Sequence, residues 1–366
     1  MTRTANRLSV KITTGGFFIA TIYTLPMDVI MILLTGGAGY IGSHAAIEFI
    51  KAGYPIIVLD NFSNSKMEAV NRSRQLSGQD FPFIEGDIRD RALLDKIFQQ
   101  HPITAVVHFA GLKAVGESVA QPLRYYDNNV NGSITLFEAM EAAGVHQIVF
   151  SSSATVYGDP HTVPIQENFP LSTTNPYGAS KLMIENILRD VHVAHAGWRI
   201  ALLRYFNPTG AHESGLIGEN PNGIPNNLMP YIAQVATGKR AALQVFGGDY
   251  ATVDGTGVRD YIHVVDLVRG HVKALEYLQQ HEELITVNLG TGKGYSVLEM
   301  LQAMEHAANK AIPYQIVARR AGDIASCYAD PHYAFEKLGW TAEFDQEAMC
   351  RDMWRWQSQN PNGYGD

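Results

Sequence analysis

Tyr177 and Lys181 have the residue types and the spacing for proton-transfer chemistry. The stretch 177–181 reads YGASK, and two side chains four residues apart lie on the same face of a helix. An unperturbed tyrosine has a pKa of about 10 and is a poor base at neutral pH. A lysine ammonium one turn away stabilises its phenolate. The spacing therefore predicts that Tyr177 acts as a general base and acid.

The Tyr-x-x-x-Lys spacing is not specific by itself, because the chain has 17 tyrosines and a second match occurs at Tyr333 and Lys337. That second match follows no strand that ends in serine, and we interpret it as a helix surface in a smaller lobe. Tyr177 is preceded by Ser153, at the end of the apolar strand 147–150, which is expected to hydrogen-bond a substrate hydroxyl and relay its proton. The alternative for Tyr177 is an ordinary tyrosine where a loop enters a helix.

A glycine-rich turn lies further upstream. The apolar run 31–34 leads into TGGAGYIG at 35–42, and apolar residues with helical spacing follow. Gly36 suits a tight turn, Gly39 lets backbone N–H groups approach a pyrophosphate, and Gly42 lets the helix pack closely on the sheet. The phosphates would lie at the helix N-terminus, where free N–H groups and the helix dipole favour negative charge.

Asp60 ends the next apolar strand, residues 55–60, where an acid is expected to hydrogen-bond an adenosine ribose. An acid there repels a 2′-phosphate, so the pattern favours NAD over NADP. A glycine triplet alone is weak in a chain with 33 glycines, and the alternative is an ordinary turn with an N-capping Asp. We favour a dinucleotide site because the strand, the glycines and the acid coincide.

Strands and helices alternate from residue 31 onward, which predicts an α/β fold with a doubly wound parallel sheet of the Rossmann kind. Ligands bind at the carboxyl edge of such sheets. We therefore expect Asp87 and Ile88 beside the adenine, and residues 111–113 at the same edge. Strands are expected at residues 31–35, 55–60, 81–88, 105–111, 147–150, 200–204 and 285–289, and long helices at 122–143 and 177–195.

The 366 residues are enough for two domains. We expect an NAD-binding domain at residues 31–206, completed by a return segment near 258–290. Residues 207–257, rich in glycine, proline and asparagine, and residues 291–366 would form a smaller α/β substrate lobe.

The first 30 residues carry basic side chains and a short apolar run at 17–23. They have features of a signal or transit peptide, but the run is too short to span a bilayer, and the nucleotide fold would begin directly after any cleavage. We therefore expect an N-terminal extension that has no role in the fold.

Composition limits the partners. The chain is 46% hydrophobic and 17% charged, as suits a globular protein with a large core, and its formal net charge of −8 argues against nucleic acid or an anionic membrane as the main partner. Its two cysteines form no disulfide framework, and its histidines are scattered without a zinc pattern. We expect a reducing, cytoplasmic location and no metal site.

The motifs together resemble the extended short-chain dehydrogenase/reductases, and within them the 4-epimerases of UDP-hexoses. The resemblance runs from Met31 to the C-terminus, and residues 1–30 have no counterpart in the family pattern. Its most specific stretches are HFAGLKAVGES at 108–118, SSSATVYG at 151–158, LRYFNP at 203–208, GIPNNLMP at 223–230 and GTGVRDYIH at 255–263.

The resemblance implies that Tyr177 takes the proton of the sugar 4-hydroxyl while a hydride passes from C4 to NAD. The 4-keto sugar would then turn, and the hydride would return to its opposite face. The implied function is the reversible epimerisation of UDP-galactose and UDP-glucose with retained NAD, within galactose metabolism. Besides the glycines, Asp60, Asp87 and Ile88, the implied cofactor contacts are Tyr40, Ile41, Asn61, Asn64, Ser65, Phe109, Ala110, Gly111, Lys113, Asn128, Ser153, Tyr177, Lys181 and Phe206.

For the UDP-sugar, the resemblance implies contacts from both parts of the chain. Two arginines would offer forked donors to the pyrophosphate, one aspartate would accept a hydrogen bond from the uridine ribose, and Phe246 would pack against uracil. The residues that hold the nucleotide would be Asn207, Asn227, Leu228, Arg259, Arg320 and Asp323, while Lys113, Ser153 and Tyr177 face the sugar.

Cys327 lies, by the resemblance, at a position that lines the sugar pocket near the 2-substituent. A cysteine leaves room for an N-acetyl group, which a tyrosine would exclude, so we expect UDP-GalNAc and UDP-GlcNAc to be epimerised as well. The alternative is a small buried thiol without influence on specificity.

Two other functions are weighed against this one. A nucleotide-sugar 4,6-dehydratase needs an acid and a base, commonly an Asp-Glu pair, after the strand-end hydroxyl, but Ala154 and Thr155 follow Ser153. A non-catalytic NAD-binding sensor would tolerate the loss of Tyr177 or Lys181, but the chain keeps both. The resemblance also suggests a homodimer joined by two helices per subunit, near 122–143 and 177–195.

Overall fold

The structure of the protein, a computed structural model, describes residues 31–320 and 323–365. The predicted N-terminal extension, residues 1–30, lies outside the described residues. The larger part of the fold is a seven-stranded sheet in which every strand pair is parallel. Its order is β10-β6-β5-β4-β1-β2-β3, which confirms the predicted doubly wound sheet. The strands are β1 (Met31–Thr35), β2 (Ile56–Asp60), β3 (Phe83–Glu85), β4 (Ile103–His108), β5 (Gln147–Ser153), β6 (Arg199–Tyr205) and β10 (Leu284–Leu289).

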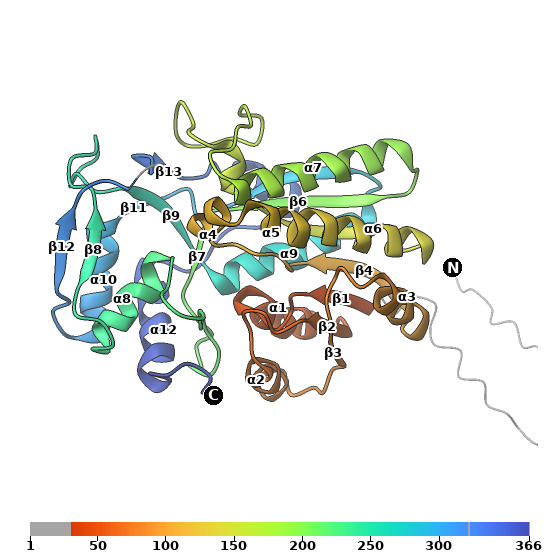
Figure 1. Cartoon of the computed structure of the whole chain (residues 1–366), viewed down its shortest axis with the longest axis horizontal. Coiled ribbons are helices and arrows are strands. Elements are labelled where there is room, and N and C mark those ends of the chain that lie inside the picture. Colours follow the sequence, from red (N-terminus) through yellow and green to blue (C-terminus); the bar gives the residue numbers. More distant parts are fainter. Residues whose placement is uncertain (1–30, 321–322, 366) are drawn as a thin grey trace, which may run out of the picture.

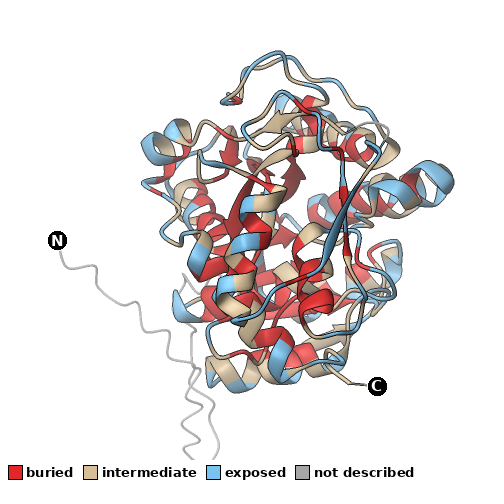
Figure 2. Cartoon of the chain, turned by 90° about the vertical axis from the view of Figure 1, so that its left-hand side faces the viewer, coloured by how far each residue is buried: buried red, intermediate tan, exposed pale blue. Residues whose placement is uncertain are grey.

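The central strands are apolar on both faces because helices cover both faces (Figure 1). Ile32 and Leu34 of β1 join a core with α1 and α9, whereas Leu33 joins a second core with α3, α6 and α7 on the opposite face. Figure 2 shows the buried residues concentrated in this sheet and in the helix surfaces that face it. The covering helices are α1 (Tyr40–Lys51), α2 (Met67–Ser77), α3 (Arg91–Gln100), α6 (Gly132–Ala142), α7 (Pro176–Ala194) and α9 (Val264–Gln280).

The chain order reverses between β1 and β4, because β2 and β3 lie on one side of β1 and β4, β5 and β6 on the other. In doubly wound folds a crevice opens at this point, at the carboxyl ends of the strands. The glycine turn after β1 and the loop after β4 therefore meet where a ligand would bind.

The predicted long helix 122–143 is more complex than expected. A short helix α4 (Val115–Ala120) precedes it, and it begins with α5 (Pro122–Tyr125), widens into one π-helical segment, η1 (Tyr126–Asn131), and continues as α6. π-Helical segments are rare and often lie at functional sites. Here the segment carries Asn128 to the wall of the crevice and buries Asn129, which hydrogen-bonds Leu112 of the loop after β4.

A smaller lobe follows β6. It lies on the left in Figure 1, whereas α3 and α6 of the larger part extend to the right. It has a small sheet of order β11-β9-β13 with β7 paired to β9, and a separate pair of strands, β12 and β8. Helices α8, α10 and α12 pack with them around a third core. The elements are β7 (Asn207–Thr209), α8 (Leu228–Ala236), β8 (Leu243–Phe246), β9 (Val258–His263), β11 (Gly294–Ser296), α10 (Val297–Ala308), β12 (Tyr314–Val317), β13 (Ser326–Cys327) and α12 (Gln346–Gln359).

Two segments differ from the expected arrangement. The expected return segment 258–290 is divided, since β9 pairs within the small sheet whereas α9 and β10 join the main sheet. Helix α11 (His332–Leu338), expected in the small lobe, packs on α9 and β10. Trp340, just after it, belongs to the same large core. Tyr333 and Lys337 lie on α11, with the Lys337 ammonium 5.8 Å from the Tyr333 ring centroid, as in an ordinary helix-surface pair.

Candidate active site

The end of β5 and the start of α7 bring Ser153 and Tyr177 together. Asn175 caps α7 by accepting a hydrogen bond from Gly178 N at 2.9 Å, and Pro176 occupies the first helical position. Burial raises the pKa of the Tyr177 hydroxyl above its ordinary 10, while a hydrogen bond to Ser153 and the charge of Lys113 act to lower it. The predicted serine and tyrosine are therefore direct neighbours.

Lys181 lies one turn along α7 from Tyr177, and its ammonium binds the end of β5. Its side chain is 5% exposed, its Nζ donates to the Ser151 carbonyl at 2.8 Å and lies 4.9 Å from the Phe150 ring centroid, and burial lowers its pKa to about 8. The charge of Lys113, from the loop after β4, also acts to lower the pKa of Tyr177. The helical spacing predicts that Lys181 lies one turn from Tyr177. It does not predict that the Ser151 carbonyl accepts the hydrogen bond of the Lys181 ammonium.

Lys113 is held by a carboxylate that the sequence did not single out. Its Nζ lies 2.9 Å from Glu219 Oε1, and the same oxygen accepts a hydrogen bond from Asn227 Nδ2 at 3.0 Å. The Lys113 ammonium also lies 5.9 Å from the centroid of the Tyr40 ring. A lysine of the large domain and an asparagine at the start of α8 thus share one acceptor.

The glycine turn has the conformation that the sequence predicts. Gly36 has a φ of 70°, and a Cβ there would lie 2.7 Å from Ala110 N. A Cβ at Gly42 would lie 2.3 Å from the Gly36 carbonyl oxygen, so α1 packs directly on the turn. Gly39 begins α1 without a side-chain cap. The first N–H groups of α1 therefore face a turn that only glycines can form, as a pyrophosphate site requires.

Asp60 organises two loops of the same crevice. Its Oδ2 accepts from Ala38 N at 3.0 Å, and its Oδ1 accepts from Phe62 N at 2.9 Å and Ser65 Oγ at 2.7 Å. A carboxylate has about four acceptor positions, so one is left for a ribose hydroxyl. Asn61 Nδ2 donates to Asp87 at 2.9 Å, and Asp87 is also bound by Arg89, which lowers its pKa.

A single cavity at this crevice gathers most of the predicted cofactor contacts. Those that line it are Gly36, Gly39, Tyr40, Ile41, Gly42, Asp60, Asn61, Asn64, Ser65, Ile88, Phe109, Ala110, Gly111, Lys113 and Asn128. The predicted residues that do not line it are Asp87, Ser153, Tyr177, Lys181 and Phe206. Leu112, expected at this edge, lines it too, and the lining residues that the sequence did not indicate are Ala38, Leu59, Ser63, Lys66, Gly86, Tyr205, Gly218, Glu219, Asn220, Pro221, Asn222 and Tyr364.

The missed residues near Glu219 and Tyr364 come from the chain after β6 and are brought in by tertiary contacts. Asn222 N donates a hydrogen bond to Asn64 Oδ1 at 3.2 Å, and the Arg72 guanidinium lies 5.3 Å from the Tyr364 ring centroid. No local motif marks these positions. The glycine, the proline and the two asparagines of residues 218–222 are the sequence signal of a turn there.

The residues predicted to hold the nucleotide-sugar form two groups. Arg320 pairs with Asp323 through two hydrogen bonds of 3.2 and 3.0 Å and lies 5.4 Å from the Phe246 ring centroid. Arg259 donates to the carbonyls of Val258 and Ile324 and is opposite Cys327 in the register of β9 and β13.

Cys327 lies close to the catalytic strand end. It packs against a cluster of buried residues that includes Phe206 and Ala154, which directly follows Ser153, and burial raises the pKa of its thiol to about 11. Asn207 is exposed at the start of β7, and Leu228 is half-buried at the start of α8. Cys327 and Phe206 thus lie beside the strand end that carries Ser153, whereas Arg259 lies on β9 in the middle of the small sheet and Arg320 follows β12.

A doubly wound sheet with a glycine turn at its crossover and a Tyr-x-x-x-Lys helix beside a serine-ended strand defines a dinucleotide-dependent enzyme of the short-chain dehydrogenase/reductase class. The model of the NAD dependent epimerase/dehydratase family matches residues 32–290, and the chain belongs to this family.

Within the family the similarity is to UDP-glucose 4-epimerases. The chain is 62% identical to that of Bacillus subtilis over 91% of this chain and 98% of the relative, and 57% identical to that of Homo sapiens with the same coverage. Its fold matches the crystal structure of UDP-glucose 4-epimerase from Bifidobacterium longum in complex with NAD+ and UDP, with a TM-score of 0.89 and 54% identity over 91% of this chain and 99% of that one.

Within residues 31–320 and 323–365, no helix has the length and apolar character needed to cross a membrane.

Proposed function

We propose that this chain catalyses the reversible epimerisation of UDP-galactose and UDP-glucose at C4, with NAD as a retained cofactor. The observation that carries the proposal is identity of 56–62% to UDP-glucose 4-epimerases over nearly their whole length. The neighbouring Ser153 and Tyr177 at the carboxyl edge of a dinucleotide-type sheet agree with it. A dehydratase is disfavoured because Ala154 and Thr155 have no group that can act as acid or base at C5 and C6.

The residues of the crevice fit the cofactor. The glycine turn leaves the first N–H groups of α1 for the pyrophosphate, and Asp60 keeps one acceptor position for the adenosine ribose. NAD, when bound, supplies the hydride acceptor and donor.

Side chains of this chain would carry out the proton transfer. Tyr177 Oη would take the proton of the sugar 4-hydroxyl, with Ser153 Oγ as its hydrogen-bond partner. Burial favours the neutral phenol, so the enzyme needs positive charge near Tyr177, which Lys181 and Lys113 would supply. Lys181, bound to the Ser151 carbonyl, fixes the start of α7 against the end of β5.

Binding of UDP is assigned to the small lobe. Arg259 and Arg320 would bind the pyrophosphate, Asp323 the uridine ribose, and Phe246 the uracil, with Asn207, Asn227 and Leu228 beside them. Because Arg320 and Asp323 now pair with each other, binding would exchange this exposed pair for contacts to the nucleotide. Exposed ion pairs contribute about 0–1 kcal/mol, so the exchange costs little.

The proposal is tested with purified protein, UDP-galactose and no added NAD. Formation of UDP-glucose would support both the epimerase and the retained cofactor. Activity only after NAD is added would keep the reaction and contradict retention. Absence of turnover in both cases would refute the proposed function and favour the dehydratase or the sensor.

A second proposal is that UDP-GalNAc and UDP-GlcNAc are also substrates, because Cys327 is small and packs beside Phe206 and Ala154. A neighbour that is 37% identical, with a TM-score of 0.80 over 90% of this chain and 99% of that one, is described as the UDP-Glc/GlcNAc 4-epimerase of Campylobacter jejuni. We expect Cys327→Tyr to abolish turnover of UDP-GalNAc and to spare UDP-galactose, with Cys327→Ala as the size-matched control that keeps both. Equal loss of both activities in Cys327→Tyr would contradict this role.

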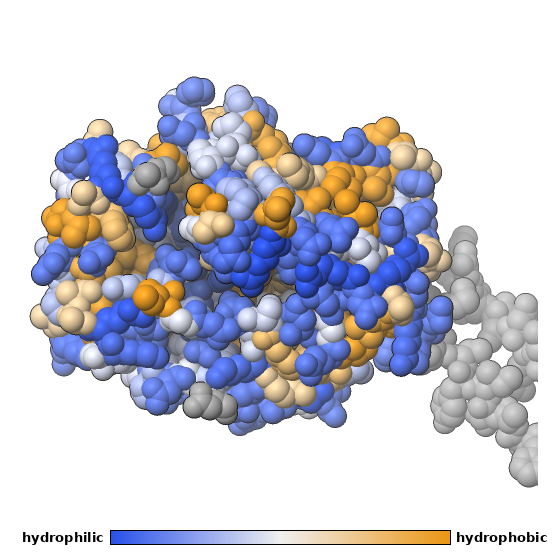
Figure 3. Space-filling model, viewed as in Figure 1, coloured by the Kyte–Doolittle hydropathy of each residue, from blue (hydrophilic) through white to orange (hydrophobic). Residues whose placement is uncertain are grey.

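We also propose a cytoplasmic homodimer. Exposed apolar side chains lie on the helices that the family resemblance implicates, and Figure 3 shows apolar surface over α6 and α7. They are Leu123 on α5, Ile134 on α6, and Met183 and Val193 on α7, and Val119 is exposed on the neighbouring α4. Sedimentation equilibrium of the purified protein checks the stoichiometry.

A further inference from the structure

The segment 360–365, which follows α12, runs from the small lobe towards α2 of the larger part of the fold (Figure 1). Tyr364 of this segment lines the cofactor cavity, and so does the loop 218–222 between β7 and α8. The two are joined, because the Tyr364 hydroxyl donates to the Gly218 carbonyl and accepts from Gly218 N, each at 3.2 Å. The segment 360–365 and the loop 218–222 therefore form one wall of the cavity.

This wall packs on Trp356 of α12. The Trp356 indole is buried, its ring centroid lies 4.8 Å from that of Tyr364, and its Nε1 donates to the Glu219 carbonyl at 3.1 Å. A Cβ on Gly218 would lie 2.4 Å from Trp356 Cγ, so the loop passes directly over the indole. Tyr364 also packs against the core of the small lobe, to which Trp356 belongs.

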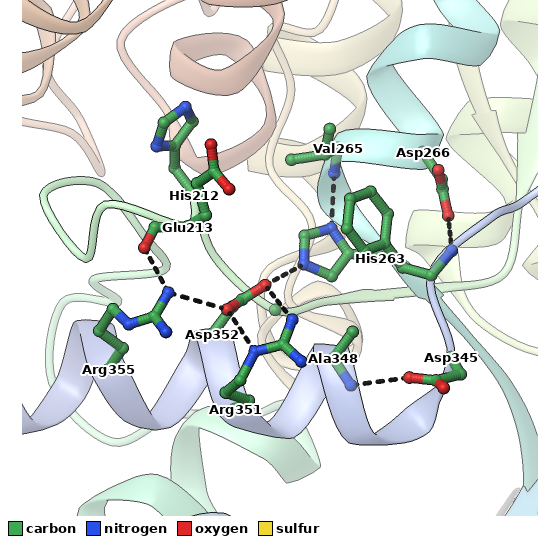
Figure 4. A network of polar contacts seen from close by, with 12 residues as sticks. His212, Glu213, His263, Val265, Asp266, Asp345, Ala348, Arg351, Asp352 and Arg355 are labelled. Atoms are coloured by element: carbon green, nitrogen blue, oxygen red, sulfur yellow. Dashed lines mark hydrogen bonds and ion pairs between the residues drawn. The ribbon is translucent and has the colours of Figure 1, made fainter.

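Helix α12 is itself held within the small lobe (Figure 4). Asp352 is buried and lies 3.4 Å from His263, at the end of β9. Arg355 contacts Asp352 at 3.2 Å and donates to the Glu213 carbonyl, at the start of the same loop region. The wall is therefore built on the small lobe, and its attachment to the larger part of the fold depends on separate contacts.

Arg72 of α2 provides the central contact of this attachment. Its Nη1 donates to the Leu216 carbonyl at 2.9 Å and to Asn360 Oδ1 at 2.7 Å. Its Nε donates to Glu68 at 2.7 Å, one turn back on α2, which fixes the direction of the guanidinium. One side chain of the larger part thus holds both the loop region and the segment 360–365.

Further contacts across the same boundary are also hydrogen bonds, and their donors line the cavity. They are Lys66 Nζ to the Gly365 carbonyl, Asn222 N to Asn64 Oδ1 at 3.2 Å, Asn222 Nδ2 to the Ser63 carbonyl at 3.3 Å, and Lys113 Nζ to Glu219 Oε1 at 2.9 Å. Hydrogen bonds near solvent are exchanged for bonds to water at small net cost. The wall is therefore attached by apolar packing to the small lobe and by polar contacts to the larger part, and the polar side opens more easily.

We propose that the segment 360–365 and the loop 218–222 act as a clasp, a wall of the cofactor cavity that Arg72 holds closed and that must open for NAD to enter or leave. The inference rests on the proposed function, in which NAD is retained between turnovers. A clasp slows the exchange of NAD in both directions. A residue that only contacts NAD would instead act on its release.

The test follows NAD labelled in its adenine, without any sugar. Release is measured by diluting loaded protein into excess unlabelled NAD, and uptake is measured with nucleotide-free protein. In Arg72→Met, which loses the hydrogen bonds to Leu216 and Asn360, release should be about tenfold faster. Uptake should be faster by a similar factor, because the same opening lies on the path in both directions. The Kd of NAD should therefore stay nearly constant.

Two comparisons make the result specific. Asn360→Ala breaks the same contact from the other side, so it should speed both rates, and the double variant with Arg72→Met should be little faster than the faster single variant. Arg91→Met is the matched control, because Arg91 is also paired with an acid four residues along its helix. Its partners, Asp95 and Glu138, lie on α3 and α6, so it should leave both rates unchanged.

Faster release in Arg72→Met with unchanged or slower uptake would overturn the inference, because it would indicate a lost binding contact or a damaged fold. Unchanged release would overturn it as well. Rapid exchange of NAD in the unmodified protein is a separate result, which would contradict retention. The clasp is then judged by the ratio of variant to unmodified rates, which should still exceed one in both directions, and equal rates would overturn it.

Discussion

Replacing Lys181 by methionine should change how the stability of the protein depends on pH. The Lys181 ammonium is buried, donates one hydrogen bond to the Ser151 carbonyl at 2.8 Å, and has the Phe150 ring 4.9 Å away. No carboxylate is within ion-pair distance of it among the described residues. Burial therefore dominates, and the pKa of Lys181 falls from its ordinary 10.5 to about 8.

The sign and size of the effect follow from proton linkage. Between pH 8 and 10.5 the unfolded chain binds a proton on Lys181 that the folded protein has lost, so the free energy of unfolding rises with pH. The slope is about 1.4 kcal/mol per pH unit, and the whole window of roughly 2.5 units amounts to about 3 kcal/mol. Below pH 8 both states are protonated, and the folded protein carries the full cost of the buried charge.

The assay is urea unfolding of nucleotide-free protein at pH 7.5, 8.5 and 9.5. The unmodified protein should gain about 1 kcal/mol per pH unit relative to Lys181→Met in the upper part of this range. Comparing the two proteins at each pH cancels the buried tyrosines, which both contain. Lys96→Met, which removes an exposed lysine of α3, is the matched control and should follow the unmodified protein. A constant difference between the unmodified protein and Lys181→Met from pH 7.5 to 9.5 would refute the reasoning.

Two further predictions concern the framework of the site. Glu185 and Arg204 are fully buried and joined by hydrogen bonds of 2.9 and 2.6 Å. Glu185→Leu should lower the free energy of unfolding in urea by about 3–5 kcal/mol, because it leaves the Arg204 charge without its carboxylate. Adding Arg204→Met should restore part of that stability. A double variant no more stable than Glu185→Leu would contradict this. Gly42→Ala should displace α1 from the glycine turn and weaken NAD binding about tenfold, or about 1.4 kcal/mol, as measured by retention of NAD on gel filtration. Gly116→Ala is the control, because a Cβ there meets nothing within 4 Å. Equal retention of NAD in both variants would contradict the role of the glycine turn.

The features predicted correctly from the sequence are local ones. Strands β1, β2, β5 and β6 are short apolar runs, and each ends in a polar residue or a turn that marks the carboxyl edge of the sheet. The glycine turn, Ser153 and Tyr177 follow directly from those ends. Such patterns are set by neighbours in the chain, so they can be recognised without the tertiary structure.

The features that the sequence did not predict depend on distant contacts. The partner of Lys113 is 106 residues away in Glu219, and Lys181 donates to the backbone carbonyl of Ser151 in β5, 30 residues away. The pairing of β9 with the small sheet depends on strands on either side of it in the chain. Neither hydrophobic periodicity nor motif spacing encodes which of several polar groups a long flexible side chain will reach.

The edge position of β10 has a consequence for how the protein folds. Residues 31–206 contain six of the seven parallel strands. Strand β6 gains its second neighbour only from β10. Leu203 of β6 belongs to the core that includes residues of α9 and Trp340. During synthesis, the cofactor domain therefore stays incomplete, with an open strand edge and uncovered leucines, until about residue 340 has left the ribosome. The nucleotide-binding half of this chain is thus finished by the residues made almost last, and a fragment that ends at β6 should aggregate instead of folding as an independent domain.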